Sequence, residues 1–220
     1  MNILGIIEIE RKTDLLAFAA FMISVMTAFY QLGVYLSGPK AKLLAPEGVT
    51  IAQFENRPGQ QYVSVIAPIS VVNESNASEP LLVTKQTALL KIGAQTKLLS
   101  WHDWIDAPIG AEGISFLTSE AVHPFVIDTK KISSGLIRFT PQRDPCNKSA
   151  KCDPNDPFIT FEDFRGMVLQ ALGNGFEQFE TVVSVEFDNH ETVTKVCSAP
   201  LHPIHLKLLR DIGYFMELCE

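Results

Sequence analysis

The chain has 220 residues, with 18 Lys and Arg against 25 Asp and Glu, so its formal net charge is −7. Basic residues do not run together with aromatic ones anywhere in the sequence, and this argues against a nucleic-acid partner. The acidic balance after residue 36 also argues against binding of that part to anionic lipid.

Residues 15–36 form the most apolar stretch, with 22 residues and no formal charge. As a helix this stretch would be about 33 Å long, which is enough to cross the hydrocarbon core of a bilayer. We expect a short tail over residues 1–14 and a retained transmembrane signal-anchor helix over residues 15–36. The alternatives are a cleaved signal peptide, which has a shorter apolar region, and a buried globular helix.

One face of the predicted helix carries small and polar residues. Ala20, Ser24 and Ala28 are spaced four apart, so they share one stripe on which another helix can approach closely. Gln31 lies near the C-terminal end of the helix, and burying its amide in lipid costs free energy unless a partner forms hydrogen bonds with it. These four residues are the candidate transmembrane packing site; a passive single span is the alternative.

The basic flanks do not decide the orientation of this helix. Arg11 and Lys12 precede it, and Lys40 and Lys42 follow it, so the positive-inside rule gives a tie. A short tail before a long domain favours a cytoplasmic N-terminus. We therefore expect a single-pass protein in the membrane with the bulk of the chain extracytoplasmic.

After a connector over residues 37–47, residues 48–220 have the pattern of a mainly-β domain. Apolar residues alternate with polar ones, and clusters of Gly, Pro, Asn and Asp separate the segments. We expect strands over 49–54, 62–72, 81–92, 97–105, 113–117, 124–128, 136–140, 181–187 and 192–198. Many short strands predict a β-sandwich, and their order resembles an immunoglobulin-like architecture. The Cys…Trp…Cys hallmark is missing because Trp101 has no cysteine before it, so the resemblance concerns architecture alone.

Two accessory helices are expected in the second half. Thr160 and Asp163 make an approximate capping box before apolar residues at helical spacing, which predicts a helix near 160–172. Pro203 suits a first helical turn, and the apolar spacing after it predicts a second helix over 203–219.

The four cysteines are Cys146, Cys152, Cys197 and Cys219. Cys146 and Cys152 stand at the two ends of a polar loop, so we predict a disulfide between them in an oxidising compartment. The pairing of Cys197 and Cys219 stays open. The spacings do not fit a structural zinc site, and four free thiols in a reducing compartment are the alternative.

Three groups of polar residues are candidate sites, and we assign none of them a catalytic, metal-binding or cofactor-binding role. His102 and Asp103 could do acid–base work, but on a regular strand they point to opposite faces. His202 and His205 could share a helix face as metal ligands or be structural residues. One loop concentrates side-chain oxygens from Asp144, Asp153, Asn155 and Asp156. This pattern is compatible with a loose calcium site or with a solvated loop.

The expected function is binding. The anchor and the exported domain are typical of a subunit or accessory factor of a membrane complex, with the lipid bilayer and a membrane protein as partners. The alternatives are a membrane-tethered hydrolase that uses His102, Asp103 or the late histidines, and an envelope sensor. A scatter of the five histidines over the fold would count against the hydrolase.

Overall fold

The computed structural model describes residues 2–3, 7–8, 12–36, 40–57, 60–75, 79–110, 113–141 and 159–220. Its helices are α1 (Lys12–Leu36), α2 (Phe161–Gly173) and α3 (Pro203–Asp211). Its longer strands are β3 (Ala41–Leu44), β4 (Gly48–Arg57), β5 (Gln60–Asn73), β6 (Leu81–Ile92), β7 (Gln95–Asp106), β10 (Leu117–Ala121), β11 (Phe125–Ile127), β12 (Ile132–Pro141), β14 (Gln178–Phe187), β15 (Thr192–Pro200) and β16 (Tyr214–Leu218). The two-residue strands are β1 (Asn2–Ile3), β2 (Ile7–Glu8), β8 (Ile109–Gly110), β9 (Gly113–Ile114) and β13 (Ile159–Thr160).

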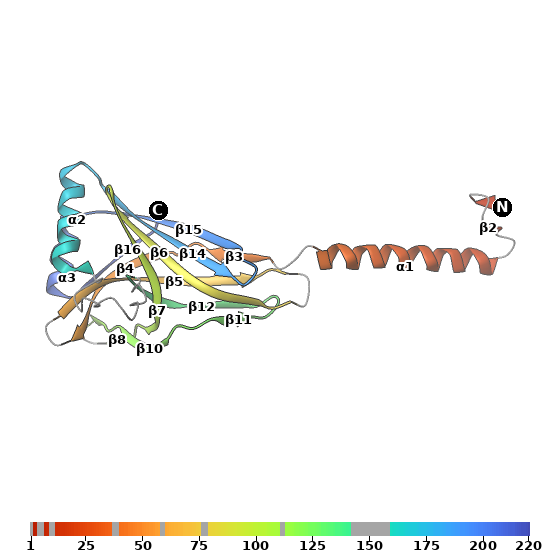
Figure 1. Ribbon diagram of the computed structural model, residues 1–220, viewed down its shortest axis with the longest axis horizontal. Helices are drawn as coiled ribbons and strands as arrows, with labels where there is room; N and C mark the ends of the chain where they lie inside the picture. Colours follow the sequence, from red (N-terminus) through yellow and green to blue (C-terminus); the bar gives the residue numbers. More distant parts are fainter. Residues whose placement is uncertain are drawn as a thin grey trace, which may run out of the picture.

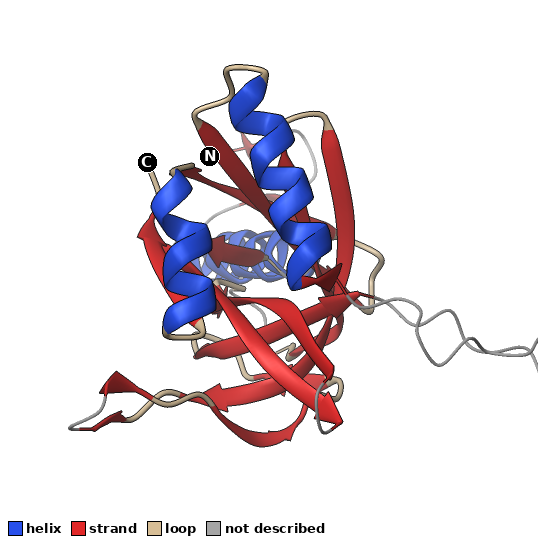
Figure 2. Ribbon diagram, turned by 90° about the vertical axis from the view of Figure 1, so that its left-hand side faces the viewer, coloured by secondary structure: helices blue, strands red, loops and turns tan. Residues whose placement is uncertain are grey.

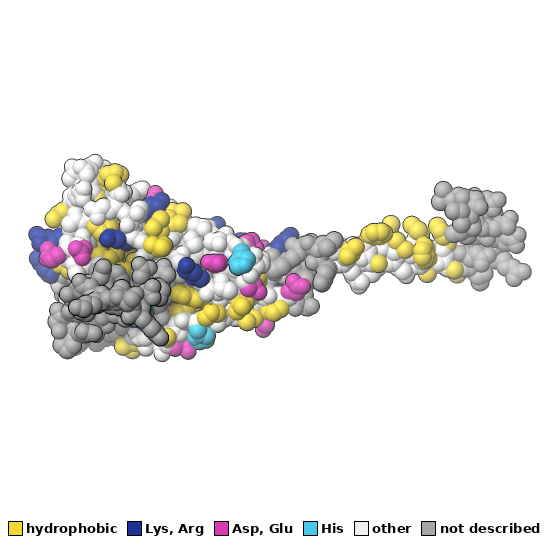
Figure 3. All heavy atoms as spheres, viewed as in Figure 1, with side chains coloured by type: hydrophobic (Ala, Val, Ile, Leu, Met, Phe, Trp, Pro, Cys, Tyr) yellow, Lys and Arg dark blue, Asp and Glu magenta, His cyan; other side chains and the backbone are white. Residues whose placement is uncertain are grey.

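Helix α1 extends away from the β domain and presents apolar side chains along its length (Figures 1 and 3). Its segment Leu15–Gly33 is long and apolar enough to cross a membrane, and no part of that segment is buried. The apolar helix predicted from the sequence is therefore present. A signal sequence near an N-terminus passes the same test of length and composition.

Twelve of the described strands form one antiparallel sheet in the order β15-β14-β6-β7-β12-β5-β4-β16, with the shorter strands added beside it. β3 and β4 pair with successive parts of β5, so together they follow β5 as one long strand interrupted near Pro46. The sheet curls until its two ends approach each other (Figure 2). A disulfide between Cys197 on β15 and Cys219 after β16 links these ends, and the Glu220 N–H donates to the Ser198 carbonyl at 2.9 Å.

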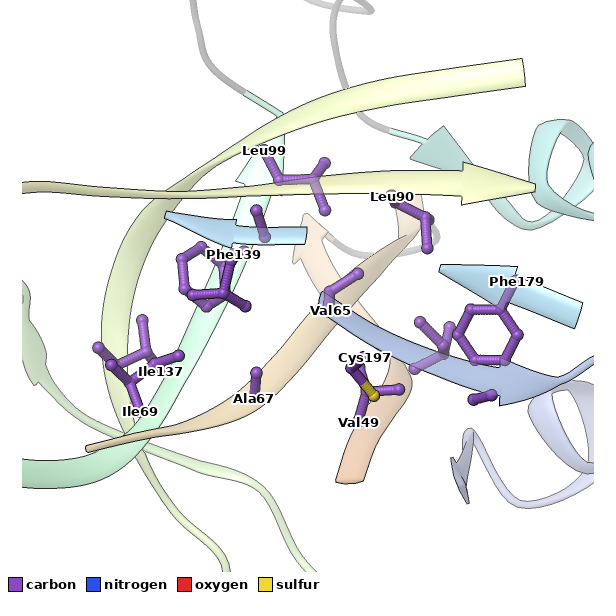
Figure 4. Close-up of a cluster of buried hydrophobic side chains, with 14 of the residues drawn as sticks. Val49, Val65, Ala67, Ile69, Leu90, Leu99, Ile137, Phe139, Phe179 and Cys197 are labelled. Carbon is purple, nitrogen blue, oxygen red and sulfur yellow. The ribbon is translucent and has the colours of Figure 1, made fainter. Parts of the chain in front are cut away.

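The mainly-β antiparallel domain is thus as expected, but the sheet is nearly barrel-shaped, and the immunoglobulin-like sandwich is not confirmed. Alternating residues of β5, including Val65, Ala67 and Ile69, point into the enclosed space and meet residues from the other strands (Figure 4). Sandwiches and barrels share this inward alternation, so the sequence pattern alone does not distinguish them.

The helices α2 and α3 lie at the end of the β domain that is farther from α1 (Figures 1 and 2). The predicted capping box is confirmed: the Asp163 N–H donates to Thr160 Oγ1, and the Thr160 N–H donates to Asp163 Oδ2. The Phe164 ring of α2 lies 6.3 Å from that of Phe215 on β16, which ties the helix to the sheet.

The single helix expected over 203–219 is wrong beyond Asp211. Helix α3 ends there, Gly213 takes a φ of 85°, and the chain then forms β16, which pairs with β4. A positive φ of this kind is a glycine conformation that ends helices. The apolar residues Ile212 and Phe215 fit helical spacing, but Phe215 also fits the alternation of a strand, and pairing with β4 decides between the two.

Candidate functional site

The pair His102 and Asp103 lies at an irregularity of β7. Arg138 of β12 is opposite Asp103 while Phe139 is opposite Trp101, so His102 is an extra residue in β7. Such a bulge breaks the period-two alternation of a strand and redirects side chains. His102 Nδ1 therefore contacts Asp103 Oδ1, and the expectation that these two side chains diverge is wrong.

Asp103 forms an ion pair with Arg138, and the two side chains are only 5% and 8% exposed. Arg138 Nη1 donates to the Tyr62 hydroxyl at 3.3 Å, and its guanidinium lies 4.3 Å from the centroid of the Phe54 ring. Burial lowers the pKa of Arg138 from its usual value, and the charge of Tyr62 opposes this shift. The ion pair connects β7 to β12, and the hydrogen bond to Tyr62 connects β12 to β5. These contacts are typical of a structural role within the sheet.

His202 and His205 lie together at the start of α3, with ring centroids 5.6 Å apart. His205 is buried: its Nε2 donates to Glu217 Oε1 at 2.7 Å, and its Nδ1 accepts the backbone N–H of His202 at 3.3 Å. The ring also stacks on Phe215 at 4.3 Å. His205 therefore connects α3 to β16.

The pKa of His205 is lowered from its ordinary value. Desolvation by burial is the largest cause, the hydrogen bond and charge of Glu217 act in the opposite direction, and His202 lowers it further. The neutral imidazole is the form that both of its hydrogen bonds require. Within the part of the chain that the structure describes, no three His, Cys, Asp or Glu side chains are arranged to hold a metal ion.

The remaining predicted positions are placed as follows. Ala20, Ser24, Ala28 and Gln31 all lie on α1, where Ser24 Oγ donates to the Ala20 carbonyl at 2.9 Å, and Gln31 is exposed. His123 follows β10, directly after Val122, whose N–H donates to the His102 carbonyl at 3.0 Å, whereas His190 lies in the turn between β14 and β15. The predicted disulfide of Cys146 with Cys152 and the oxygen-bearing residues Asp144, Asp153, Asn155 and Asp156 lie outside the described residues.

A cleft of about 970 Å³ opens at the end of the domain where α2 and α3 lie. The end of α2 and the start of β14 form one side of its lining, and the end of β15 and the start of α3 form another. Its apolar lining includes Phe176, which is 43% exposed, with Leu172, Pro200 and Pro203. No local sequence pattern indicates this cleft, because its walls come from segments far apart in the chain.

The charged lining of the cleft is mainly acidic. Among the described residues that line it, there are three carboxylates, Glu177, Glu180 and Glu220, and one ammonium, that of Lys91. Lys91 Nζ pairs with Glu180 Oε2 at 3.0 Å, and Gln178 Nε2 donates to Glu220 Oε2 at 2.8 Å. The cleft therefore combines an exposed aromatic ring with a net negative wall.

Comparison with protein families and with curated proteins found no match. Among solved structures, a protein from Archaeoglobus fulgidus is similar over 74% of this chain and 91% of its own, at 10% sequence identity and a TM-score of 0.32.

Proposed function

We propose that this chain is a single-pass membrane protein whose β domain binds a partner protein, as a subunit or accessory factor of a membrane complex. The observation that carries the proposal is the combination of an exposed apolar helix with a cleft at the opposite end of the domain. Such an arrangement holds a binding surface away from the bilayer, within reach of a neighbouring protein.

An exported domain is part of the proposal. The disulfide between Cys197 and Cys219 supports it, because structural disulfides persist in oxidising compartments and are rare in the cytosol. The short segment before α1 would then remain in the cytoplasm, and α1 would be retained as an anchor.

Binding is favoured over hydrolysis by what the polar residues do. Asp103 is engaged by Arg138, and His205 is engaged by Glu217 and by the backbone of α3, so these groups connect elements of the fold. The enclosed space of the sheet is lined by apolar side chains, including Phe139 and Phe179 (Figure 4). The open cleft beside α2 and α3 is thus the surface that we assign to the partner.

Two measurements test the proposal. The full chain should stay in the membrane pellet after alkaline carbonate extraction, because a spanning helix is held far more firmly than a peripheral one. A photo-crosslinking amino acid at Phe176 should then give a defined adduct in membranes, which the same amino acid at Asn189 does not give. Release of the full chain by carbonate would disprove the anchor, and equal adducts at both positions would disprove the cleft as the binding surface.

A further inference from the structure

We infer that the cleft binds a basic segment of the partner polypeptide, one that carries Lys or Arg beside an apolar residue. This inference rests on the proposed function and adds the chemistry of the partner. The lining contributes three carboxylates and one ammonium, so its formal charge is −2. A cationic segment is the complement of that charge, and complementary potentials guide association and exclude partners of the wrong sign.

Glu177 is the carboxylate most open to a ligand. Its side chain is exposed and makes no ion pair or hydrogen bond with other described residues, while its backbone carbonyl accepts the Leu201 N–H at 2.7 Å. Glu180 and Glu220 each have one neighbouring donor, Lys91 and Gln178, and each keeps a second carboxylate oxygen without a partner in the described part. The backbone contact holds the main chain of Glu177 at the cleft.

The end of α2 adds to the negative wall. Helix α2 ends at Gly173, and Gly175 and Phe176, which follow it, line the cleft. Carbonyl groups at a helix C-terminus carry a partial negative charge, which a basic residue in the last turn commonly offsets. The last turn of α2 contains no basic residue, so the helix dipole adds to the negative potential at the cleft, although the Ala171 and Leu172 carbonyls already accept the N–H groups of Phe176 and Gly175.

The apolar lining suits the stems of basic side chains. The Phe176 ring is 43% exposed, and Leu172 and Pro200 extend the apolar surface. Lys and Arg pack their methylene groups along such surfaces while the charged head stays in water, and a cation over an aromatic face gains further attraction. A volume of about 970 Å³ holds several side chains of an extended segment, not a folded domain.

The occupant is assigned as polypeptide because the cleft combines charge with apolar surface. A free polyamine would pair with the carboxylates and lay its methylene chain on Phe176, but it has no aromatic ring to stack there. A basic peptide that contains an aromatic residue uses both parts of the lining, so loss of either part should weaken it.

The probe is a fluorescein-labelled peptide made of three Lys-Ser-Phe repeats, titrated with the full chain in an uncharged detergent. A peptide with Glu in place of Lys, a peptide with Ala in place of Phe, and spermine serve as comparisons. Glu177→Lys and Phe176→Ala alter the two parts of the lining. Asp188→Lys is the matched control, because Asp188 is an exposed acidic residue just after β14, as Glu177 lies just before it.

We expect the Lys-Ser-Phe peptide to bind and Glu177→Lys to weaken its binding by roughly tenfold, with less than a twofold change for Asp188→Lys. Phe176→Ala should lose roughly fivefold, the scale of a cation–aromatic contact, and the Phe-to-Ala peptide should lose roughly fivefold, the scale of an aromatic pair. Equal loss with Asp188→Lys, or equal binding of the Glu peptide, would overturn the inference. Displacement by spermine that is unaffected by Phe176→Ala would reassign the cleft to small polyamines.

The inference and the proposed function fail in different ways. A partner that crosslinks at Phe176 but copurifies equally with Glu177→Lys would leave the proposed function intact and disprove the basic segment. Loss of the crosslink at Phe176 would remove the binding surface itself.

Discussion

Cys197 on β15 and Cys219, which follows β16, link the two outermost strands of the sheet order through a disulfide, with their Cα atoms 4.9 Å apart. The neighbouring hydrogen bond from the Glu220 N–H to the Ser198 carbonyl continues this connection. Cys197 is fully buried in the main core, and Cys219 packs against that core. In the described sheet β15 and β16 stand at opposite ends of the strand order and do not pair with each other, so the disulfide links the two ends of the curled sheet.

Removal of this disulfide should lower the free energy of unfolding. The bridge spans 22 positions of sequence, and a loop of this length is worth about 3 kcal/mol in the chain-entropy model. We expect the Cys197→Ser, Cys219→Ser double variant to lose that amount, measured by urea unfolding of the full chain in detergent and followed by tryptophan fluorescence. Reductant should destabilise the wild type by about that much more than the variant, which keeps the predicted bridge between Cys146 and Cys152. Equal stability of both proteins without reductant would show that the bridge does not hold the sheet closed.

Two glycines form a matched pair for substitution by Ala. At Gly135 on β12 a new Cβ would lie 2.5 Å from Cζ3 of Trp104, whereas at Gly166 on α2 nothing lies within 4 Å. We expect Gly135→Ala to cost about 1–3 kcal/mol through overpacking, and Gly166→Ala to stabilise α2 by about 0.5–1 kcal/mol. Urea midpoints that shift in opposite directions would bear this out. A neutral Gly135→Ala would show that the Trp104 ring moves freely.

The parts of the fold that can be predicted from the sequence are those that depend on residues close together in the chain. The apolar helix follows from an uncharged run, and α2 follows from Thr160, Asp163 and the apolar spacing after them. The strands follow from alternation, but the curl of the sheet does not, because it depends on which strands pair at its ends. The helix predicted over the residues of β16 is wrong for the same reason, because only pairing with β4 distinguishes a strand from a helix there.

For the site too, the sequence shows the individual residues but not the contacts that depend on strand pairing. His102 and Asp103 are visible in the sequence as a polar pair between tryptophans, but the bulge that joins them is set by β12 across the sheet. Arg138 is 35 positions from Asp103, and no local spacing connects them. The cleft is also non-local, because residues before β14 and after β15 meet only through their antiparallel pairing.

The ion pair of Asp103 and Arg138 predicts a strongly non-additive result. Arg138→Met alone leaves a buried carboxylate without its cation, and Asp103→Leu alone leaves a buried guanidinium, so each should cost about 3–5 kcal/mol. The double variant removes both charges and should cost far less than the sum. Urea unfolding of the four proteins gives the coupling energy directly. Additive losses would mean that the two side chains do not act as a pair.

The stability of the domain should fall as the pH drops below about 6.5, the unperturbed pKa of histidine. The pKa of His205 is lowered in the folded state, so over this range the unfolded chain binds more protons and unfolding is favoured. The contribution is fully present above that pH and is lost progressively below it. His205→Phe, which keeps a ring stacked on Phe215, should reduce the difference in urea midpoint between pH 7 and pH 5. His123→Phe, at an exposed position, is the control and should leave that difference unchanged.

Gln31→Leu distinguishes a transmembrane helix that packs against a partner from one that only anchors the chain. Gln31 is exposed on α1, three residues beyond Ala28 on the small-residue stripe. If its amide bonds to a partner helix, the change removes a contact worth about 1 kcal/mol and should weaken copurification in mild detergent. If the helix only anchors, Leu suits lipid better and membrane retention should hold or improve. Ser24→Leu tests the same face by blocking close approach, and full recovery of the partner with both variants would leave the β domain as the sole interaction surface.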